Sequence, residues 1–305
     1  DALGEADTAL GHAIGEAVTA LLQDAAVAAG DVGAIGSHGQ TVRHRPPPRQ
    51  HPFTLQLGDP NVIAEHTGIP VVADFRRRDV AAGGQGAPLV PAFHAAVFGA
   101  GTDRAVVNVG GMANVTLLPG GRPEDATGFD TGPGNVLLDA WARRHLLAER
   151  DDRGAWAGQA VMDPELLERL LEEPYFLAPP PKSTGREHFD LPWLEDRLAA
   201  RPPSAPAVVQ ATLTELTART IARGIAAAGN RRPEEVIVCG GGRHNDVLMD
   251  RLAAALPDSA VTTTDAHGLD GDWVEAVAFA WLAARRLAAV PGNVPAATGA
   301  RGPRI

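Results

Sequence analysis

The sequence is poor in cysteine, basic patches and long apolar runs, and each shortage excludes a class of protein. Cys239 is the only cysteine among 305 residues, so an internal disulfide and a cysteine-based zinc cluster are excluded. The net charge is −10 without a basic stripe, which argues against a nucleic-acid partner. No apolar run approaches the roughly 20 residues that span a membrane. A globular protein of a reducing compartment, the cytoplasm, is therefore expected.

The beginning of the chain lacks both an initiator Met and a secretion signal. The first eight residues carry three acidic side chains and no basic one, unlike the start of a signal peptide. The pattern of residues 3–29 predicts an amphipathic helix, whose apolar face consists of Leu3, Leu10, Ile14, Val18 and Leu21. We therefore expect a fragment, or a protein whose beginning has been removed.

What the sequence does contain is an alternation of strand and helix patterns, which predicts an α/β protein. The length allows two domains, with a boundary near residues 95–101. Strands are expected at 32–37, 53–57, 70–73, 105–109, 115–118, 235–239 and 261–264. Helices are expected at 61–67, 93–98, 136–148, 163–172, 191–200, 207–228, 246–256 and 273–289.

Residues 128–139 are the richest in chemistry, with three glycines, one proline and two carboxylates. Asp130 precedes a Thr-Gly-Pro-Gly sequence that predicts a turn, and Asn135 is a good N-cap for the helix that follows. A carboxylate and free backbone N–H groups beside a helix N-terminus suit anion binding and phosphoryl transfer. The alternative is a surface turn in which Asp130 caps its own backbone.

Other glycine-rich and polar segments predict ligand contacts more weakly. Gly110-Gly111 is expected to form the turn of a β-hairpin. Gly240–Gly242 joins an expected strand to an expected helix, which is an arrangement found in nucleotide-binding sites. Neither a G-x-G-x-x-G fingerprint nor a phosphate loop is present in the sequence. The loop 82–89 follows three arginines at 76–78, which either hold an anion or form a solvated surface run. Glu275 either contacts a ligand or simply complements a helix N-terminus.

Taken together, these segments resemble the anhydro-N-acetylmuramic acid kinase family. The matching runs follow the family's order over most of the chain: Ile35–Thr41, Gln56–Asp59, Asp74–Asp79, Gly83–Leu89, Asn108–Asn114, Phe129–Asn135, Pro181–Glu187, Cys239–Gly242 and Glu275-Ala276.

The resemblance implies a two-domain fold of the acetate and sugar kinase/Hsc70/actin superfamily, which is ribonuclease H-like, with the nucleotide between the domains. Residues 1–98 would form an incomplete sugar-binding domain, 99–290 the nucleotide-binding domain, and 291–305 a tail returning to the first. The family uses ATP, Mg²⁺ and water to open 1,6-anhydro-N-acetylmuramic acid and phosphorylate O6, yielding N-acetylmuramic acid 6-phosphate and ADP in peptidoglycan recycling. The amino sugar and ATP are the implied partners, with no membrane, and a homodimer is a further hypothesis.

The resemblance also assigns roles to residues. Asp130 would be the base that activates water. The sugar would contact His38, Arg76, Asp79, Gly84, Gln85 and Glu275. The nucleotide would contact Asn108, Gly110, Gly111, Gly132, Gly134, Asn135, Gly240, Gly241 and Gly242. No protein metal ligand is expected, because six of the histidines lack metal-ligand spacing: His38, His44, His94, His188, His244 and His267.

One family motif has no counterpart in this sequence, the N-terminal Gly-Thr-Ser-x-Asp-Gly turn that binds ATP phosphates and metal. We therefore expect the first phosphate loop and its strands to be absent. Two hypotheses remain: an active kinase, or a truncated or inactive homologue that binds a muropeptide sugar or nucleotide without transfer. A third, a kinase of another sugar or acid, is disfavoured by the runs at 83–88 and 128–135.

Overall fold

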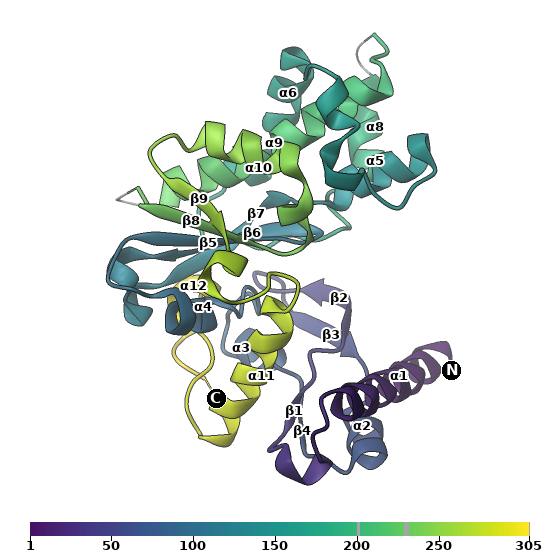
Figure 1. Cartoon of the computed structure of the whole chain (residues 1–305), viewed down its shortest axis with the longest axis vertical. Helices are drawn as coiled ribbons and strands as arrows, with labels where there is room; N and C mark the ends of the chain where they lie inside the picture. The colour runs from purple at the N-terminus through teal and green to yellow at the C-terminus, as the bar shows by residue number, and fades with distance from the viewer. Residues whose placement is uncertain (200–201, 229–231, 305) are drawn as a thin grey trace. The chain divides into compact units, whose positions relative to one another are not determined.

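The computed structural model describes residues 1–199, 202–228 and 232–304, and its contacts divide the chain into two units (Figure 1). The first unit comprises residues 1–93 and 275–305, and the second comprises residues 94–274. The sequence placed these divisions after residues 98 and 290, so the structure moves most of the last long helix into the first unit. The assignment of sugar and nucleotide to separate domains stays a prediction.

The second unit is built on a five-stranded sheet. Its strands are β5 (Arg104–Val109), β6 (Met112–Leu118), β7 (Thr127–Pro133), β8 (Glu235–Cys239) and β9 (Ala260–Thr263). Their spatial order is β7-β6-β5-β8-β9, with β6 antiparallel to both neighbours and β8 and β9 parallel to β5. This order, with an antiparallel second strand, is that of the ribonuclease H-like fold. The predicted fold class is therefore confirmed.

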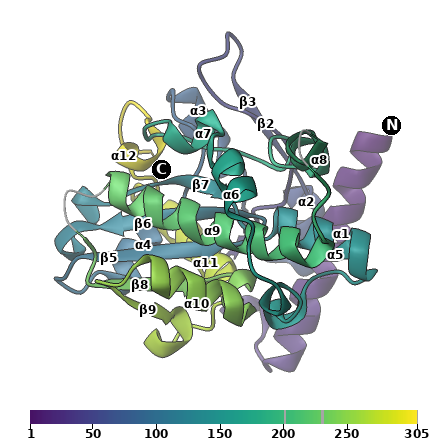
Figure 2. The same cartoon turned by 90° about the horizontal axis from the view of Figure 1, so that it is seen from above.

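Helices α9 (Pro206–Ala228) and α10 (Asp246–Ala255) cover one face of this sheet (Figures 1 and 2). Val107, Val115 and Phe129 pack against Ile221 and Leu252 on that face. Because side chains alternate along a strand, the intervening residues point to the other face. There His94, on α4 (Pro91–Phe98), bonds through Nδ1 to the hydroxyl of Thr116 at 2.8 Å.

A second apolar cluster lies among the helices of the same unit. It joins α9 to α5 (Val136–Leu146), α6 (Pro164–Leu171) and α8 (Leu191–Ala199), with the short α7 (Pro174–Leu177) beside them. Leu166, Leu170 and Leu194 are fully buried in it. Phe176 and Phe189 stack at 5.5 Å, which ties α7 to the segment before α8.

The first unit combines short strands with helices. Strands β1 (Ile35–Gly36) and β4 (Val71–Val72) pair in parallel, and β2 (Gln40–Arg45) and β3 (Phe53–Leu57) form a hairpin. The helices are α1 (Ala2–Asp24), α2 (Pro60–Thr67), α3 (Arg77–Ala81), α11 (Val274–Leu287) and α12 (Pro295–Thr298). Gly36 lets α11 approach β1, because a Cβ there would lie 2.3 Å from the carbonyl oxygen of Phe279.

Several expected elements change in the structure. The first helix ends at Asp24 rather than residue 29, and Leu3 on its expected apolar face is 56% exposed. The helix instead packs on α2 through the buried Gly11 and Gly15, since glycines permit close approach. Strands 32–37 and 70–73 shorten to two residues each, and α3 was not expected. Residue 200 of helix 191–200 lies outside the described residues.

Across the described residues, no helix is both long enough and apolar enough to cross a membrane.

Candidate functional site

Asp130 lies in a row of polar side chains that crosses the sheet of the second unit. It faces Asn114 on β6, which faces Asn108 on β5, which in turn faces Cys239 on β8. This row is on the face opposite α9 and α10. Asp130 is 8% exposed, and Oδ1 of Asn114 is buried without a hydrogen-bond partner in the described part of the chain. Buried unsatisfied polar atoms are rare in native proteins, so this row is a candidate ligand site.

Asp130 is held by the segment that follows α6. The backbone N–H of Thr184 donates to Oδ2 of Asp130 at 3.0 Å. The hydroxyl of Tyr175 donates to the backbone carbonyl of Asp130 at 2.8 Å, and the N–H of Asp130 donates to the carbonyl of Lys182 at 3.2 Å. Burial and the charge of Asp130 raise the pKa of Tyr175, so its hydroxyl stays protonated. No role for these three residues follows from the sequence alone, although Lys182 and Thr184 lie in the family-like run Pro181–Glu187.

The local structure around Asp130 differs from the expected turn. Thr127–Pro133 is strand β7, so Asp130 belongs to the sheet. The N–H groups of Gly134, Asn135 and Val136 donate to the carbonyls of Gly110 and Gly111 at 2.8–3.1 Å. The expected cluster of free N–H groups at the start of α5 is therefore wrong, because the β5–β6 turn caps that helix.

Asn135 also behaves differently from its expected role as a helix cap. Its side chain makes no capping hydrogen bond, and Nδ2 donates instead to the carbonyl of Val109 at 3.1 Å. The same nitrogen would lie 3.7 Å from a Cβ placed on Gly241. Asn135 thus lies beside both glycine-rich segments.

The predicted nucleotide-binding residues converge at the ends of β5 and β8. A Cβ on Gly240, whose φ is +77°, would lie 2.3 Å from Oδ1 of Asn108, and a Cβ on Gly242 would lie 2.3 Å from Cγ1 of Val109. The N–H groups of Gly110 and Gly111 donate to no acceptor among the described residues, which leaves them available to an anion. A nucleotide-binding role for this group stays a prediction.

Two of the predicted glycines have packing roles. A Cβ on Gly132 would lie 2.7 Å from Cε1 of Phe176, and a Cβ on Gly134 would lie 2.4 Å from the carbonyl oxygen of Gly110. Both positions are therefore explained by close packing within the protein. Gly132 lies on β7 opposite Ala113 of β6, whereas Gly134 adjoins Gly110.

His38 and Arg76 come together in the first unit. Nε of Arg76 donates to Nε2 of His38 at 2.8 Å, and Nη1 of Arg76 donates to the carbonyl of Gly86 at 2.7 Å. Nε2 of His38 must then accept, so Nδ1 carries the proton and donates to the carbonyl of Gly39 at 2.8 Å. Burial, and next the charge of Arg76, lower the pKa of His38 to about 4. A neutral His38 therefore orients the guanidinium.

This neutral His38 predicts acid sensitivity. Its pKa falls from 6.5 to about 4 on folding, so the unfolded chain binds the proton more readily between these values. The free energy of unfolding should therefore decrease as the pH falls through this window. Urea denaturation at pH 7 and pH 4.5 should show a smaller loss for His38→Gln than for the wild type. Equal losses would contradict a half-buried, neutral His38. His94, whose pKa burial lowers to about 3, is present in both proteins and therefore does not affect the comparison.

Asp79 and Gly84 form a clamp inside the first unit. Oδ1 of Asp79 accepts from Nδ2 of Asn293 and from the hydroxyl of Thr298, both at 2.7 Å, and Oδ2 accepts from the N–H of Gly86 at 2.8 Å. A Cβ on Gly84 would lie 2.2 Å from Oδ2. Asp79 is 2% exposed. This geometry favours positioning of the 82–87 loop over the expected direct contact of Asp79 with the sugar.

The clamp predicts that Asp79→Asn destabilises the first unit. An amide would present N–H groups where the carboxylate accepts hydrogen bonds, at an expected cost of about 1–3 kcal/mol. Chemical denaturation should show this loss, with the exposed Asp74→Asn as the control. An unchanged midpoint for Asp79→Asn would show that the clamp is not needed for stability.

The two remaining predicted sugar contacts lie in the same unit. Gln85 is fixed by its side chain, which donates to the carbonyl of Pro47 at 3.1 Å. Glu275 is exposed at the second position of α11. It lies one helical turn before Phe279, whose ring is 4.6 Å from that of His38. Glu275 therefore shares a helix face with a residue that contacts His38.

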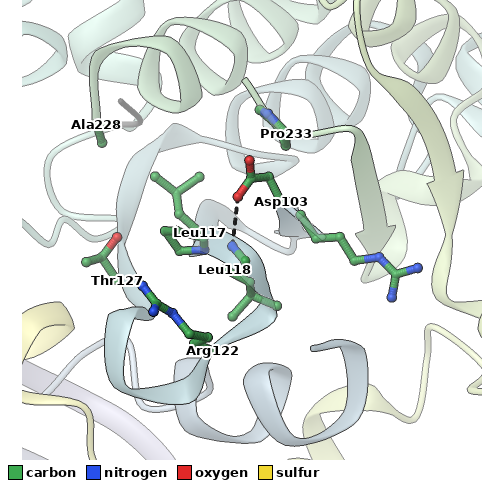
Figure 3. Close-up of a pocket in the computed structure, with 10 residues that line it drawn as sticks. Asp103, Leu117, Leu118, Arg122, Thr127, Ala228 and Pro233 are labelled. Carbon is green, nitrogen blue, oxygen red and sulfur yellow. Dashed lines mark hydrogen bonds between the residues drawn. The ribbon is translucent and has the colours of Figure 1, made fainter. Parts of the chain in front are cut away.

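A pocket of about 640 Å³ lies at the opposite end of the central strands (Figure 3). Asp103 and Leu118 line it, and the N–H of Gly120 donates to Oδ1 of Asp103 at 2.7 Å. Asp103 precedes β5, whereas Gly110 follows that strand, so this pocket is separate from the candidate site. No group of three or more His, Cys, Asp or Glu side chains that could hold a metal occurs in residues 1–199, 202–228 and 232–304.

Comparison with known proteins agrees with the resemblance noted in the sequence. The family model of anhydro-N-acetylmuramic acid kinase matches residues 1–305. An anhydro-N-acetylmuramic acid kinase of Pseudomonas syringae pv. tomato is 52% identical over 293 residues, covering 96% of this chain and 79% of that protein. One from Photobacterium profundum is 52% identical over 309 residues, covering 99% and 81%.

Similarity to solved structures is more distant. The activator of the 2-hydroxyisocaproyl-CoA dehydratase from Clostridium difficile, with bound ADPNP, has a TM-score of 0.43 and 14% identity, covering 78% of this chain and 87% of that one. Because this score is below 0.5, it adds nothing to the assignment. The match over the whole chain and the identities near one half are sufficient: the chain belongs to the anhydro-N-acetylmuramic acid kinase family.

Proposed function

We propose that this protein is a kinase that opens 1,6-anhydro-N-acetylmuramic acid with water and transfers the γ-phosphoryl group of ATP to O6. The products are N-acetylmuramic acid 6-phosphate and ADP, and the reaction serves peptidoglycan recycling. Relatives that carry this kinase's name and share 52% identity support the proposal. The observation that carries it is the buried carboxylate of Asp130, held by Thr184 on the polar face of the sheet.

In this proposal Asp130 is the general base. Its carboxylate binds a water molecule and takes its proton as the water oxygen attacks C1 of the sugar. The C1–O6 bond breaks, and O6 becomes the acceptor of the phosphoryl group. The N–H of Thr184 fixes the carboxylate orientation, because it occupies Oδ2. The hydrolytic step that Asp130 assists thus supplies O6, the acceptor of the phosphoryl group.

The sugar-binding role is assigned to the group around Arg76. Its guanidinium is oriented by His38 and by the carbonyl of Gly86. The lactyl carboxylate of N-acetylmuramic acid is a suitable partner, since arginine binds carboxylates in a planar fork. We propose that His38, Gly84, Gln85 and Glu275 complete this contact, with Asp79 acting through the loop.

The ATP-binding role is assigned to the group where β5 and β8 end. The N–H groups of Gly110 and Gly111 would bind phosphate, and the Gly240–Gly242 backbone would lie against the nucleoside. Magnesium usually binds proteins through one or two carboxylates together with substrate phosphates. When bound with ATP, Mg²⁺ would neutralise charge on the phosphates. Because ATP is the donor, we place the reaction in the cytoplasm; a homodimer remains a hypothesis.

The direct test is ADP release by the 305-residue chain with ATP, Mg²⁺ and 1,6-anhydro-N-acetylmuramic acid. A coupled assay should show release that depends on the anhydro sugar, with little release from N-acetylmuramic acid, which has no anhydro bridge to open. Mass spectrometry should identify N-acetylmuramic acid 6-phosphate. Binding of the sugar or ATP by calorimetry without any turnover would instead support a binding protein.

A further inference from the structure

Lys182 is the only lysine of the chain. All other members of the 27 Lys and Arg residues are arginines. Arginine and lysine serve equally well at most solvated positions, but they differ where a compact, rotatable ammonium is needed. The one position that keeps lysine lies in the segment that holds Asp130. This placement suggests that the ammonium has a specific task.

The ammonium of Lys182 is anchored by the backbone of α7. Nζ donates to the carbonyl of Tyr175 at 3.0 Å and to the carbonyl of Phe176 at 3.3 Å. It also lies 4.7 Å from the ring centre of Tyr175 and 5.7 Å from that of Phe129, which precedes Asp130. Two carbonyls and two aromatic faces stabilise a cation at this point. Arginine is a poorer match for this position, because its guanidinium is planar and wider than the compact ammonium of lysine.

The same lysine is joined to Asp130 through its backbone. The carbonyl of Lys182 accepts from the N–H of Asp130, and two residues later the N–H of Thr184 donates to the carboxylate. Tyr175, the ring under the ammonium, bonds to the carbonyl of Asp130. The cation and the carboxylate are therefore held by one closed set of hydrogen bonds. Moving Lys182 would move Thr184 and the orientation of Asp130.

Lys182 and Asp130 also interact through their charges. Burial lowers the pKa of Lys182, and the negative charge of Asp130 acts in the opposite direction. Other titratable groups near the pair are Tyr175, which stays protonated, and His188, which bonds to the hydroxyl of Thr184 at 3.2 Å and to Glu173. From α9, the residues against β7 are uncharged: Thr217, Thr220 and Gly224.

We propose that Lys182 is a positioning residue for Asp130, fixing the carboxylate through its loop and keeping it ionised through a compact positive charge that arginine cannot replace in full. The proposal rests on the proposed function, in which Asp130 must be ionised to take a proton from water. It goes beyond that function by giving the sole lysine a defined task. Because Lys182 acts through Asp130, the proposal can be tested by the pH dependence of catalysis and by direct titration of the Lys182 ammonium.

The first test needs no catalytic activity. Since the chain has one lysine, labelling with ¹³C-lysine gives a single side-chain Cε resonance without assignment. Its titration should have a midpoint below that of an ordinary lysine in the wild type. In Asp130→Asn, the midpoint should fall further by at least about 0.5 pH unit, since a nearby opposite charge raises a cation's pKa. An identical midpoint in both proteins would show that the two groups do not interact.

The second test follows kcat/KM against pH. Removing the cation in Lys182→Met should raise the pKa of Asp130 and move the acidic limb upward by about 0.5–1 pH unit. Lys182→Arg should leave the acidic limb of the kcat/KM profile in place, because the positive charge is kept. It should lower kcat about tenfold, because the guanidinium does not match the contacts of the ammonium. Arg122→Met, at an exposed cation near the far end of β6, is the matched control and should leave the profile unchanged.

These results separate the proposal from the proposed function. A lysine that is merely structural would lower the denaturation midpoint in Lys182→Met without moving the acidic limb, and this result would overturn the proposal. Full activity of Lys182→Arg would overturn the claim for a compact ammonium. If the wild type released no sugar-dependent ADP, the proposed function would fail, whereas the ¹³C titration would still decide whether Lys182 and Asp130 form a charge pair.

Discussion

Replacing Asp130 by Asn should lower sugar-dependent ADP release by roughly 10²–10⁴-fold, the usual contribution of a general base. The amide oxygen can still accept from the N–H of Thr184, so the local fold should persist. A carboxamide cannot take a proton from water, so attack at C1 should fail. Single-turnover ADP release, with circular dichroism and urea denaturation on the same samples, measures both effects.

The matched control for this variant is Asp139→Asn. Asp139 lies in the first turn of α5, where burial raises its pKa, and within the described residues no side-chain hydrogen bond joins it to the polar row around Asp130. Its replacement should leave turnover within a factor of a few. If Asp130→Asn kept more than a tenth of the wild-type rate while folding normally, Asp130 would not be the base.

The second large effect is expected from Gly242→Ala. The added methyl would lie 2.3 Å from Cγ1 and 2.5 Å from Cβ of Val109, a fully buried side chain directly before Gly110. Overpacking of this kind costs about 1–3 kcal/mol of stability. Because Val109 precedes the proposed phosphate turn, its displacement should also raise KM for ATP at least about tenfold. Initial rates over a range of ATP concentrations measure the change.

A compensating variant makes this prediction sharper. Val109→Ala removes Cγ1, the atom nearest to the new methyl, but keeps Cβ, so Val109→Ala/Gly242→Ala should recover part of the ATP affinity lost in the single variant. Neighbouring residues that share one space give such non-additive effects. If Gly242→Ala reduced stability with KM for ATP unchanged, Gly240–Gly242 would be a packing element and not part of the nucleotide site.

The difference between the expected and observed surroundings of Asp130 has a physical cause. Gly132, Pro133 and Gly134 are turn-forming by local chemistry, and on that basis a turn was the natural prediction. In the structure, pairing with β6 extends the strand through Pro133, which lies at its end. The carbonyls of Gly110 and Gly111 then cap α5. The pairing of β7 with β6 therefore outweighed the local preference for a turn. A short sequence motif carries no information about such long-range strand pairing.

Residue types and their order predicted which segments lie together better than which contacts their side chains make. The glycine-rich segments at 110–111 and 240–242 do adjoin each other, as their position after neighbouring strands suggests. The role of Thr184 could not be predicted, since its bond to Asp130 joins positions 54 residues apart. Asp79 illustrates the same limit, because its partners on the tail lie more than 200 residues away in the sequence.

The most direct test of the central claim is the fate of the oxygen atom from water. The reaction is run in H₂¹⁸O and stopped within minutes, and authentic N-acetylmuramic acid 6-phosphate is incubated alike to measure exchange at C1. The account predicts one ¹⁸O in the sugar beyond exchange and none in the phosphoryl group, because water activated by Asp130 attacks C1 and O6 accepts the phosphoryl group. Label in the phosphoryl group, or a sugar labelled only by exchange, would contradict it.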